Sequence, residues 1–319
     1  MFAARCAGVS LAVFVVLYVF LSVAVSRSWQ LARRMLRPRS ARSSADLLFA
    51  LRVLPLALSS LATLTITLPS FLLLEPRSTD EAIGTAPLAL GVCCLLLLGL
   101  GIARASIASM RASRALRRWL HGSMLMESRI IESDDAVPIF RTGNGAPTLT
   151  VAGVCAPKVL ISEAAVAVLN PPELRTALRH EIAHVLRYDN LKKLVFRFSV
   201  FPAMGDLEHA WSEEAEMAAD DAAVSSFRDA LDLAAALIKV SRLGPNESSG
   251  QLATALLHSS TALSRRVQRL VTWEMAQKPQ PRRRWLYALP AAAAMVIGVV
   301  TTYGSVLTQM HAVTEWLVR

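Results

Sequence analysis

The chain has 319 residues, a hydrophobic fraction of 54% and a formal net charge of +10. Soluble globular proteins are roughly 45–50% apolar, and here the excess gathers in a few long runs, which favours a membrane protein over a soluble domain with a large core. The positive charge does not indicate nucleic-acid binding, because 15 of the 34 lysines and arginines lie in three short stretches beside those runs, at 26–52, 104–118 and 282–284. We therefore expect no direct nucleic-acid partner.

Four apolar runs are long enough to cross a bilayer as helices, since a hydrocarbon core of roughly 30 Å requires about 20 residues. They cover about residues 7–25, 53–74, 86–103 and 285–306. The first run also resembles a cleaved signal peptide, but the seven arginines that follow it resist translocation and favour an uncleaved helix. Pro55 and Pro69 lie in the second run, which membrane helices tolerate when a neighbouring group satisfies the freed carbonyl.

The distribution of arginines predicts how the chain crosses the membrane, because basic flanks normally remain in the cytoplasm. It favours an external N-terminus, a cytoplasmic middle segment and an external C-terminus. The expected domains are a membrane domain at 1–103, a cytoplasmic domain at 104–284, and a fourth span with a short external tail at 285–319. Residues 104–120 are compatible with a helix that continues the third span. This organisation predicts a multi-pass protein of the inner (cytoplasmic) membrane, with the lipid bilayer as a partner.

The cytoplasmic segment contains both strand and helix patterns. Thr148–Val151 and Lys158–Ile161 are β-branched runs separated by Gly153 and Pro157, which is typical of a hairpin. A substrate strand is able to add to a sheet edge by backbone pairing, and Thr148–Val151 is the candidate edge. Helices are expected further on, at 191–204, 212–227 and 229–242.

Residues 180–184 read His-Glu-Ile-Ala-His, within a sequence that predicts a helix. Residues four apart share a helix face, so His180 and His184 are able to direct two imidazoles at one metal ion. Glu181 is turned by about 100° from His180, which lets its carboxylate reach a water on the metal rather than the metal itself. Zinc lowers the pKa of such a water to about 7, and Glu181 then acts as the catalytic base. The expected cofactor is therefore Zn²⁺.

A catalytic zinc site needs a third protein ligand, and four downstream glutamates compete for that role. Glu208 lies before the expected helix, and neither Glu213 nor Glu214 has a carboxylate four residues later. Glu213 and Glu214 also fit simple dipole complementarity in a first helical turn. Glu216 is followed at that spacing by Asp220, which is suited to accept the free N–H of a ligand histidine. The sequence therefore predicts Glu216 as the third ligand and Asp220 as a residue that orients a ligand histidine.

These motifs resemble those of membrane zinc metallopeptidases of the BlaR/MecR antirepressor type. Residues 180–191 are similar to that family's H-E-L-A-H…D-N-L pattern, and residues 216–221 to its E-x-x-C-D-D segment, with alanine where cysteine is common. Residues 156–161 and 172–175 resemble the family's strand and its P-E-E-L approach to the active helix. The order of three spans, zinc domain and one span also matches. The resemblance implies a gluzincin-type endopeptidase that faces the cytoplasm and cleaves a transcriptional repressor or itself.

The sequence departs from this family after the last span, where the β-lactam receptors carry a penicillin-binding domain and this chain has about twelve residues. None of the five lysines has a serine three residues before it, so the acylating S-x-x-K motif is absent and we expect no direct β-lactam binding. Membrane proteases of the HtpX/CAAX type also use H-E-x-x-H and E-x-x-A-D. Their later H-P…R-I-x-x-L region is loosely similar to His258 and residues 266–270. His258 is therefore either a stabiliser of the oxyanion or a histidine without a catalytic role.

Together these features predict a mainly α membrane protein, with four transmembrane helices and a cytoplasmic α+β, gluzincin-like zinc domain inserted between the third and the fourth. Its expected function is that of an integral-membrane zinc endopeptidase in signal transduction, with a protein substrate such as a repressor. Two alternatives remain, an HtpX/CAAX-type quality-control or processing protease and a non-catalytic membrane scaffold. Glu181 counts against the scaffold, which has no need of a general base.

Overall fold

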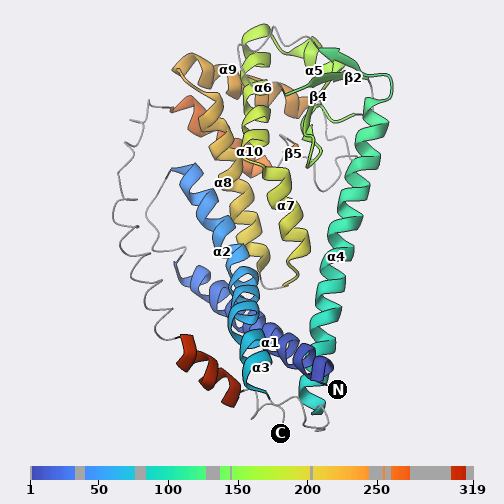
Figure 1. Cartoon of the computed structure of the whole chain (residues 1–319). Coiled ribbons are helices and arrows are strands. Elements are labelled where there is room, and N and C mark those ends of the chain that lie inside the picture. The colour runs from blue at the N-terminus through green and yellow to red at the C-terminus, as the bar shows by residue number, and fades with distance from the viewer. Residues whose placement is uncertain are drawn as a thin grey trace. The chain divides into compact units, whose positions relative to one another are not determined.

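The computed structural model describes residues 2–32, 40–75, 84–126, 137–143, 146–201, 204–243, 254–255, 260–273 and 303–313. These residues are mostly helical and include one small mixed sheet (Figure 1). The chain divides into two compact units. One unit comprises Met1–Leu31, Val53–Leu100 and Ala276–Arg319, and the other comprises Ala32–Arg52 and Gly101–Met275. The H-E-x-x-H pattern belongs to the second unit.

Three helical segments are long and apolar enough to cross a membrane, at Phe2–Leu31, Ala41–Leu74 and Thr85–Leu120. Their elements are α1 (Phe2–Ala32), α2 (Ala41–Ala62), the π-helical turn η1 (Thr63–Thr67), α3 (Leu68–Leu74) and α4 (Thr85–Leu120). The first three predicted spans are thus confirmed as apolar helices, and α4 includes the predicted continuation through 104–120. The fourth predicted span, about 285–306, lies outside the described residues except for 303–306, which begin a helix over 303–313.

The turn η1 ends two residues before Pro69, which lies in the first turn of α3. A proline has no N–H for the carbonyl four residues earlier, which here is that of Thr65. The hydroxyl of Tyr303 donates to this carbonyl oxygen at 2.6 Å. Next to the proline, the Ser70 hydroxyl donates to the carbonyl oxygen of Leu307 at 2.9 Å. The predicted satisfaction of a proline-freed carbonyl by a neighbouring group is therefore confirmed at Pro69.

In its described part, the second unit contains a five-stranded sheet with the order β1-β2-β4-β3-β5. Its strands are β1 (Met124–Met126), β2 (Ile139–Thr142), β3 (Leu149–Ala152), β4 (Lys158–Ser162) and β5 (Thr254–Ala255). β3 and β4 pair antiparallel, which confirms the predicted hairpin. β3 is not an edge strand, however, because Thr150 and Val151 also pair with β5. The prediction of a free edge at Thr148–Val151 is therefore wrong, and the reason is physical: a strand of two residues leaves no periodic signal in a sequence.

The helices described in the second unit are α5 (Glu163–Val168), α6 (Pro171–Leu186), α7 (Asp189–Phe198), α8 (Gly205–Ala223), α9 (Phe227–Arg242) and α10 (Ser260–Val271). The predicted helix at 191–204 therefore ends too late, and the one at 212–227 begins too late. Leu207, Trp211 and Ala215 are all buried at a spacing of four, so the core face of α8 extends to its first turn. Glu208 consequently lies inside α8 rather than before it. Glu213 lies in the middle of the helix and not in its first turn.

Arg52 of α2 sets the positions of α7 and α8. Its buried guanidinium donates to Ser199 Oγ at 2.7 Å and to Glu208 Oε1 at 2.9 and 3.1 Å. Beside it, Phe196 of α7 packs edge-on against Trp211 of α8, with ring centroids 5.0 Å apart. Hydrogen bonds to a buried guanidinium contribute more than neutral ones, so α8 is held against the end of α7 by both polar and aromatic contacts.

The main apolar core lies between the sheet, α6 and α9. Val159 of β4, Leu178 of α6 and Leu233 of α9 are fully buried within it. This packing fixes the apolar side of α6 and directs its other side toward α8. The two histidines of the H-E-x-x-H pattern lie on that other side.

Candidate metal centre

Helix α6 begins with strong local signals that fix its position. Asn170 and Glu173 form a reciprocal capping box, in which each side chain accepts from the other residue's backbone N–H at 2.9 Å. Pro171 follows the cap in the first helical position, where a missing N–H costs nothing. Lys239 of α9 donates to both Glu173 oxygens at 2.8 Å. The register of α6, and with it the direction of its histidines, is therefore set by residues at its start and by α9.

His180 and His184 are adjacent on α6, with ring centroids 4.8 Å apart and rings nearly perpendicular at 83°. Their Nε2 atoms are 3.2 Å apart. The closest carboxylate oxygens of Glu216, from α8, lie 3.5 Å from His180 Nε2 and 3.6 Å from His184 Nε2. All three side chains are buried. Together they form a group able to hold a metal ion.

The ligand atoms of these three side chains lie within 4.8 Å of one another, close enough to share one cation. A tetrahedral ion with bonds of roughly 2.0–2.1 Å places its ligands about 3.3 Å apart. The two Nε2 atoms are 3.2 Å apart, and each faces a different Glu216 oxygen, Oε2 at 3.5 Å from His180 and Oε1 at 3.6 Å from His184. The surrounding charge has the same implication, because Glu181, Asp189 and Asp220 are also buried, so that four buried carboxylates adjoin the site. Among the described residues, the cations beside these carboxylates include the buried Arg266, together with Lys193 and Arg187. A positive ion relieves the remaining repulsion.

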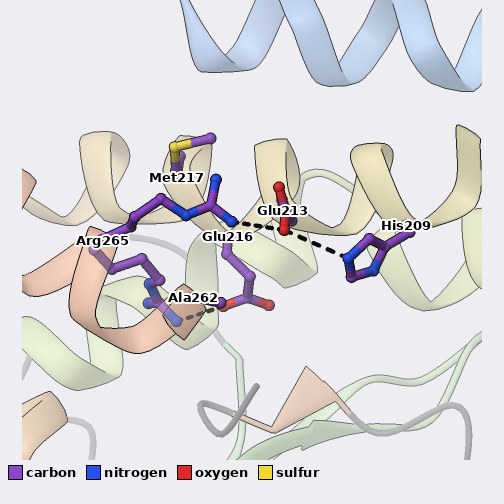
Figure 2. A pocket seen from close by; sticks show the side chains of 7 residues that line it. His209, Glu213, Glu216, Met217, Ala262 and Arg265 are labelled. Carbon is purple, nitrogen blue, oxygen red and sulfur yellow. Dashed lines mark hydrogen bonds and ion pairs between the residues drawn. The ribbon is translucent and has the colours of Figure 1, made fainter. Parts of the chain in front are cut away.

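The structure distinguishes Glu216 from the other three candidates for the third ligand by what each glutamate contacts. Glu208 accepts from Arg52 at the start of α8, and Glu213 pairs with Arg265 of α10 at 2.8 Å (Figure 2). Glu214 has a raised pKa because it is partly desolvated. Of these four acids, Glu216 is the one that the structure brings to both histidines.

His184 is oriented by Asp189, a residue for which the sequence analysis assigned no role. His184 Nδ1 lies 2.7 Å from Asp189 Oδ2, which leaves Nε2 to face the other ligands. Tyr188 makes this possible, since its left-handed backbone (φ 56°) turns the chain sharply between α6 and α7. The motif that resembles D-N-L, five residues after His184, was the signal in the sequence.

His180 is approached by the predicted Asp220 and also by Arg266, which the sequence analysis did not single out. His180 Nδ1 lies 3.0 Å from Asp220 Oδ1, but away from the line of a ring N–H bond, because Nδ1 has no hydrogen bond of good geometry in the described residues. Arg266 of α10 binds Asp220 through two hydrogen bonds of 2.6 and 2.8 Å. It also donates to Glu216 Oε2 at 2.9 Å. The only hint in the sequence was the weakly similar segment 266–270.

The pKa values of the metal-binding group follow from burial and these contacts. Burial alone raises the pKa of Glu216, but Arg266 and the two histidines outweigh it and hold that pKa well below its usual range. Burial lowers the pKa of His184. For His180, the adjacent carboxylates of Asp220 and Glu216 overcome the effect of burial and raise the pKa to about 9. Because a metal ligand must be an unprotonated imidazole, protons compete with the metal at His180.

Glu181 is buried and does not belong to the metal-binding group. Its Oε2 atom has no hydrogen-bond partner among the described residues. Burial raises its pKa to about 7, which suits a group that exchanges protons near neutral pH. Lys193, one turn after Asp189 on α7, has a lowered pKa because burial disfavours its charge. His258, the predicted stabiliser of the oxyanion, lies outside the described residues.

Comparison with known proteins adds no assignment to this geometry. No protein-family model matches the chain, and a search of curated proteins found no match. The site is therefore interpreted from its own residues: two imidazoles, one carboxylate, and a buried acid of raised pKa beside them.

Proposed function

We propose that this chain is an integral-membrane zinc endopeptidase. The observation that carries the proposal is the buried group of His180, His184 and Glu216, in which one ligand atom of each residue lies within 4.8 Å of the other two. Two imidazoles and one carboxylate are a ligand set of catalytic zinc, which keeps a fourth position open. A structural zinc site normally uses four protein ligands, often thiolates, and the described part of the chain brings no cysteine to this group.

The residues around the metal-binding group support hydrolysis of a peptide bond. Zinc, when bound, supplies Lewis-acid polarisation of the scissile carbonyl and of the attacking water. Glu181 accepts the proton that the water loses and then passes it to the leaving amine. Asp189 holds the His184 imidazole in the orientation that binding requires, and the Asp220 carboxylate lies beside the His180 ring, 3.0 Å from Nδ1. Arg266 joins Asp220 to Glu216 and so keeps the ligand carboxylate in place.

The membrane part of the proposal is supported by three apolar helices. Phe20, Leu73 and Leu96 are each about two thirds or more exposed on them, as expected for side chains that face lipid. We propose the inner (cytoplasmic) membrane and a cytoplasmic metal domain, on the arginine distribution. A reporter active only outside the cytoplasm is expected to be silent after Arg284 and active after Arg319. The reverse pattern would contradict this orientation.

The proposed substrate is a cytoplasmic regulator such as a transcriptional repressor, or the protease itself, which is what the resemblance to the BlaR/MecR type implies. A quality-control or processing role of the HtpX/CAAX type is the alternative for the same chemistry. Both place an endopeptidase at the membrane and differ in the identity of the cleaved protein.

The test compares cells that express wild type, Glu181→Gln or Glu163→Gln by mass-spectrometric mapping of new protein N-termini. Glu163 is the matched control, since its side chain is 60% exposed on α5 and pairs with Arg141. New N-termini are expected with wild type and Glu163→Gln and not with Glu181→Gln, whereas zinc content should be equal in all three. Wild-type cleavage by Glu181→Gln would refute the mechanism. Full zinc without new N-termini in any strain would favour the non-catalytic scaffold.

A further inference from the structure

A cavity of about 110 Å³ lies between α8 and α10 and reaches the metal-binding group. At its outer end are His209 and Arg265, whose side chains are 73% and 62% exposed. At its inner end are Glu216 and Arg266, which are buried. Figure 2 shows the lining side chains of the two helices around this space. The cavity thus connects the protein surface with a metal ligand.

Each charged side chain on the cavity wall already has a partner of opposite charge. Glu213 Oε1 accepts from Arg265 Nη2 at 2.8 Å and lies 3.5 Å from His209 Nε2 (Figure 2). Arg266 Nη1 donates to Glu216 Oε2 at 2.9 Å. A charged ligand group would have to compete with these pairs, at a cost in desolvation. The chemistry of the remaining wall therefore decides what the cavity accepts.

Among the described residues, the remaining wall is apolar and consists of Met217 from α8 and Ala262 from α10. A methionine adapts its shape to an apolar group, because its unbranched side chain is flexible and polarizable. A dry cavity of about 150 Å³ is able to hold benzene, so 110 Å³ suits a group somewhat smaller than an aromatic ring. Leucine and methionine side chains have this size and character.

We propose that this cavity is the specificity pocket of the metal site and that it receives a leucine-sized apolar side chain from the residue beside the scissile bond. Glu216 joins the two places, since it contributes to the metal-binding group and to the cavity wall. In this proposal, a polypeptide whose carbonyl is held at the metal places its neighbouring side chain against Met217 and Ala262, which line the same cavity as Glu216. The inference rests on the proposed function and adds the substrate class: polypeptides with a medium-sized apolar residue at the cleavage site.

A second cavity, of about 250 Å³, adjoins the group at His184. Its wall includes the turn between β3 and β4, with Val154 and Cys155, and the exposed Tyr188. The amide of Asn190 pins this turn by donating to the carbonyl oxygens of Val151 and Gly153. Val154 in this second cavity provides the control position, because the cavity adjoins the metal-binding group at His184.

The experiment uses the purified, zinc-loaded full chain and two peptide hydroxamates that differ in one side chain, hydrogen or isobutyl. The hydroxamate anchors each probe at zinc, and calorimetry measures its dissociation constant. The isobutyl probe is expected to bind about 10–100-fold more tightly, from burial of one leucine-sized group. Ala262→Phe fills the cavity and should reduce this ratio to near one. Val154→Phe, in the second cavity, should leave it unchanged.

Met217→Ala provides an independent variant in case Ala262→Phe does not fold. It enlarges the cavity and should shift the preference from the isobutyl toward a benzyl probe. Equal binding of the hydrogen and isobutyl probes to wild type would overturn the pocket while leaving the zinc site intact. Loss of the ratio in Val154→Phe, and not in Ala262→Phe, would move the pocket to the second cavity. Failure of both probes to bind the zinc-loaded protein would instead refute the open metal position of the proposed function.

Discussion

The two histidines of the metal-binding group are supported in different ways. On one side, His184 contacts Asp189, only five residues later, at 2.7 Å across the sharp turn at Tyr188. On the other side, His180 contacts Asp220, forty residues away on α8, at 3.0 Å. The same chemical device, an imidazole paired with a carboxylate, is thus built once from local structure and once from packing between helices.

The two arrangements differ in how basic side chains hold the aspartate. Asp220 accepts two hydrogen bonds from the buried Arg266, whereas Asp189 makes longer ion pairs with Arg187 at 3.6 Å and with Lys192 at 3.8 Å. Tertiary contacts alone position α8 against α10. The bidentate pair between Asp220 and Arg266 therefore fixes a relative position that the path of the chain leaves open. The α8–α10 side should therefore be the more sensitive to mutation.

The largest effect is expected from removal of the ligand on the α8 side. Glu216→Ala should abolish zinc retention after mild chelation, because two imidazoles alone hold the ion weakly. Glu213→Ala and Glu214→Ala should retain zinc, since neither side chain belongs to the metal-binding group. Metal analysis of the purified variants measures this. Full zinc in Glu216→Ala, with loss in one of the other two, would reassign the third ligand.

Adjacent arginines of α10 offer the next test. Arg266→Met should destabilise the metal-free protein by about 3–5 kcal/mol, because it leaves Asp220 and Glu216 buried without the guanidinium that joins them. Arg265→Met should cost no more than about 1 kcal/mol, since that side chain is 62% exposed. Thermal unfolding in detergent compares the two. Equal losses would show that burial of the ion pair does not determine the stability of this side.

The two aspartates should differ in what their loss affects. Asp189→Asn and Asp220→Asn are each expected to weaken zinc affinity by about 10–100-fold, because each carboxylate adjoins a ligand imidazole. Asp220→Asn should also lower the melting temperature of the metal-free protein, since Arg266 loses its bidentate partner. Asp189→Asn should change that temperature less. Competition with a zinc chelator and thermal unfolding give the two quantities.

Glu181 is part of neither the Asp189 side nor the Asp220 side of the metal-binding group. The change in activity caused by its titration near neutral pH is the smallest effect that we predict. Burial raises its pKa above that of an ordinary glutamate, to about 7, and it acts as a base only when ionised. Activity should therefore rise with pH through this pKa and fall by up to about two-fold between pH 8 and pH 7. Bound zinc lowers the pKa of Glu181, so the fall in activity between pH 8 and pH 7 becomes smaller as more of the protein is loaded with zinc. A rate that increases on acidification over this range would contradict Glu181 as the base.

The sequence by itself determined the features that depend on local spacing. The three apolar helices, the β3–β4 hairpin and the placement of His180 and His184 on one helix face follow from periodicity and turn residues, which act within a few positions. Glu216 was also selected by spacing, through Asp220 four residues later, although its helix begins earlier than predicted.

The tertiary structure alone decided how these parts meet. It assigned Asp189 to His184 and Asp220 to His180, brought Arg266 from 46 residues away to Asp220, and covered β3 with a strand of two residues. Such contacts join positions far apart in the chain, and they exist only because burial of the core places α6, α8 and α10 together. A helix pattern specifies which face is buried, but it does not specify the partner that buries it.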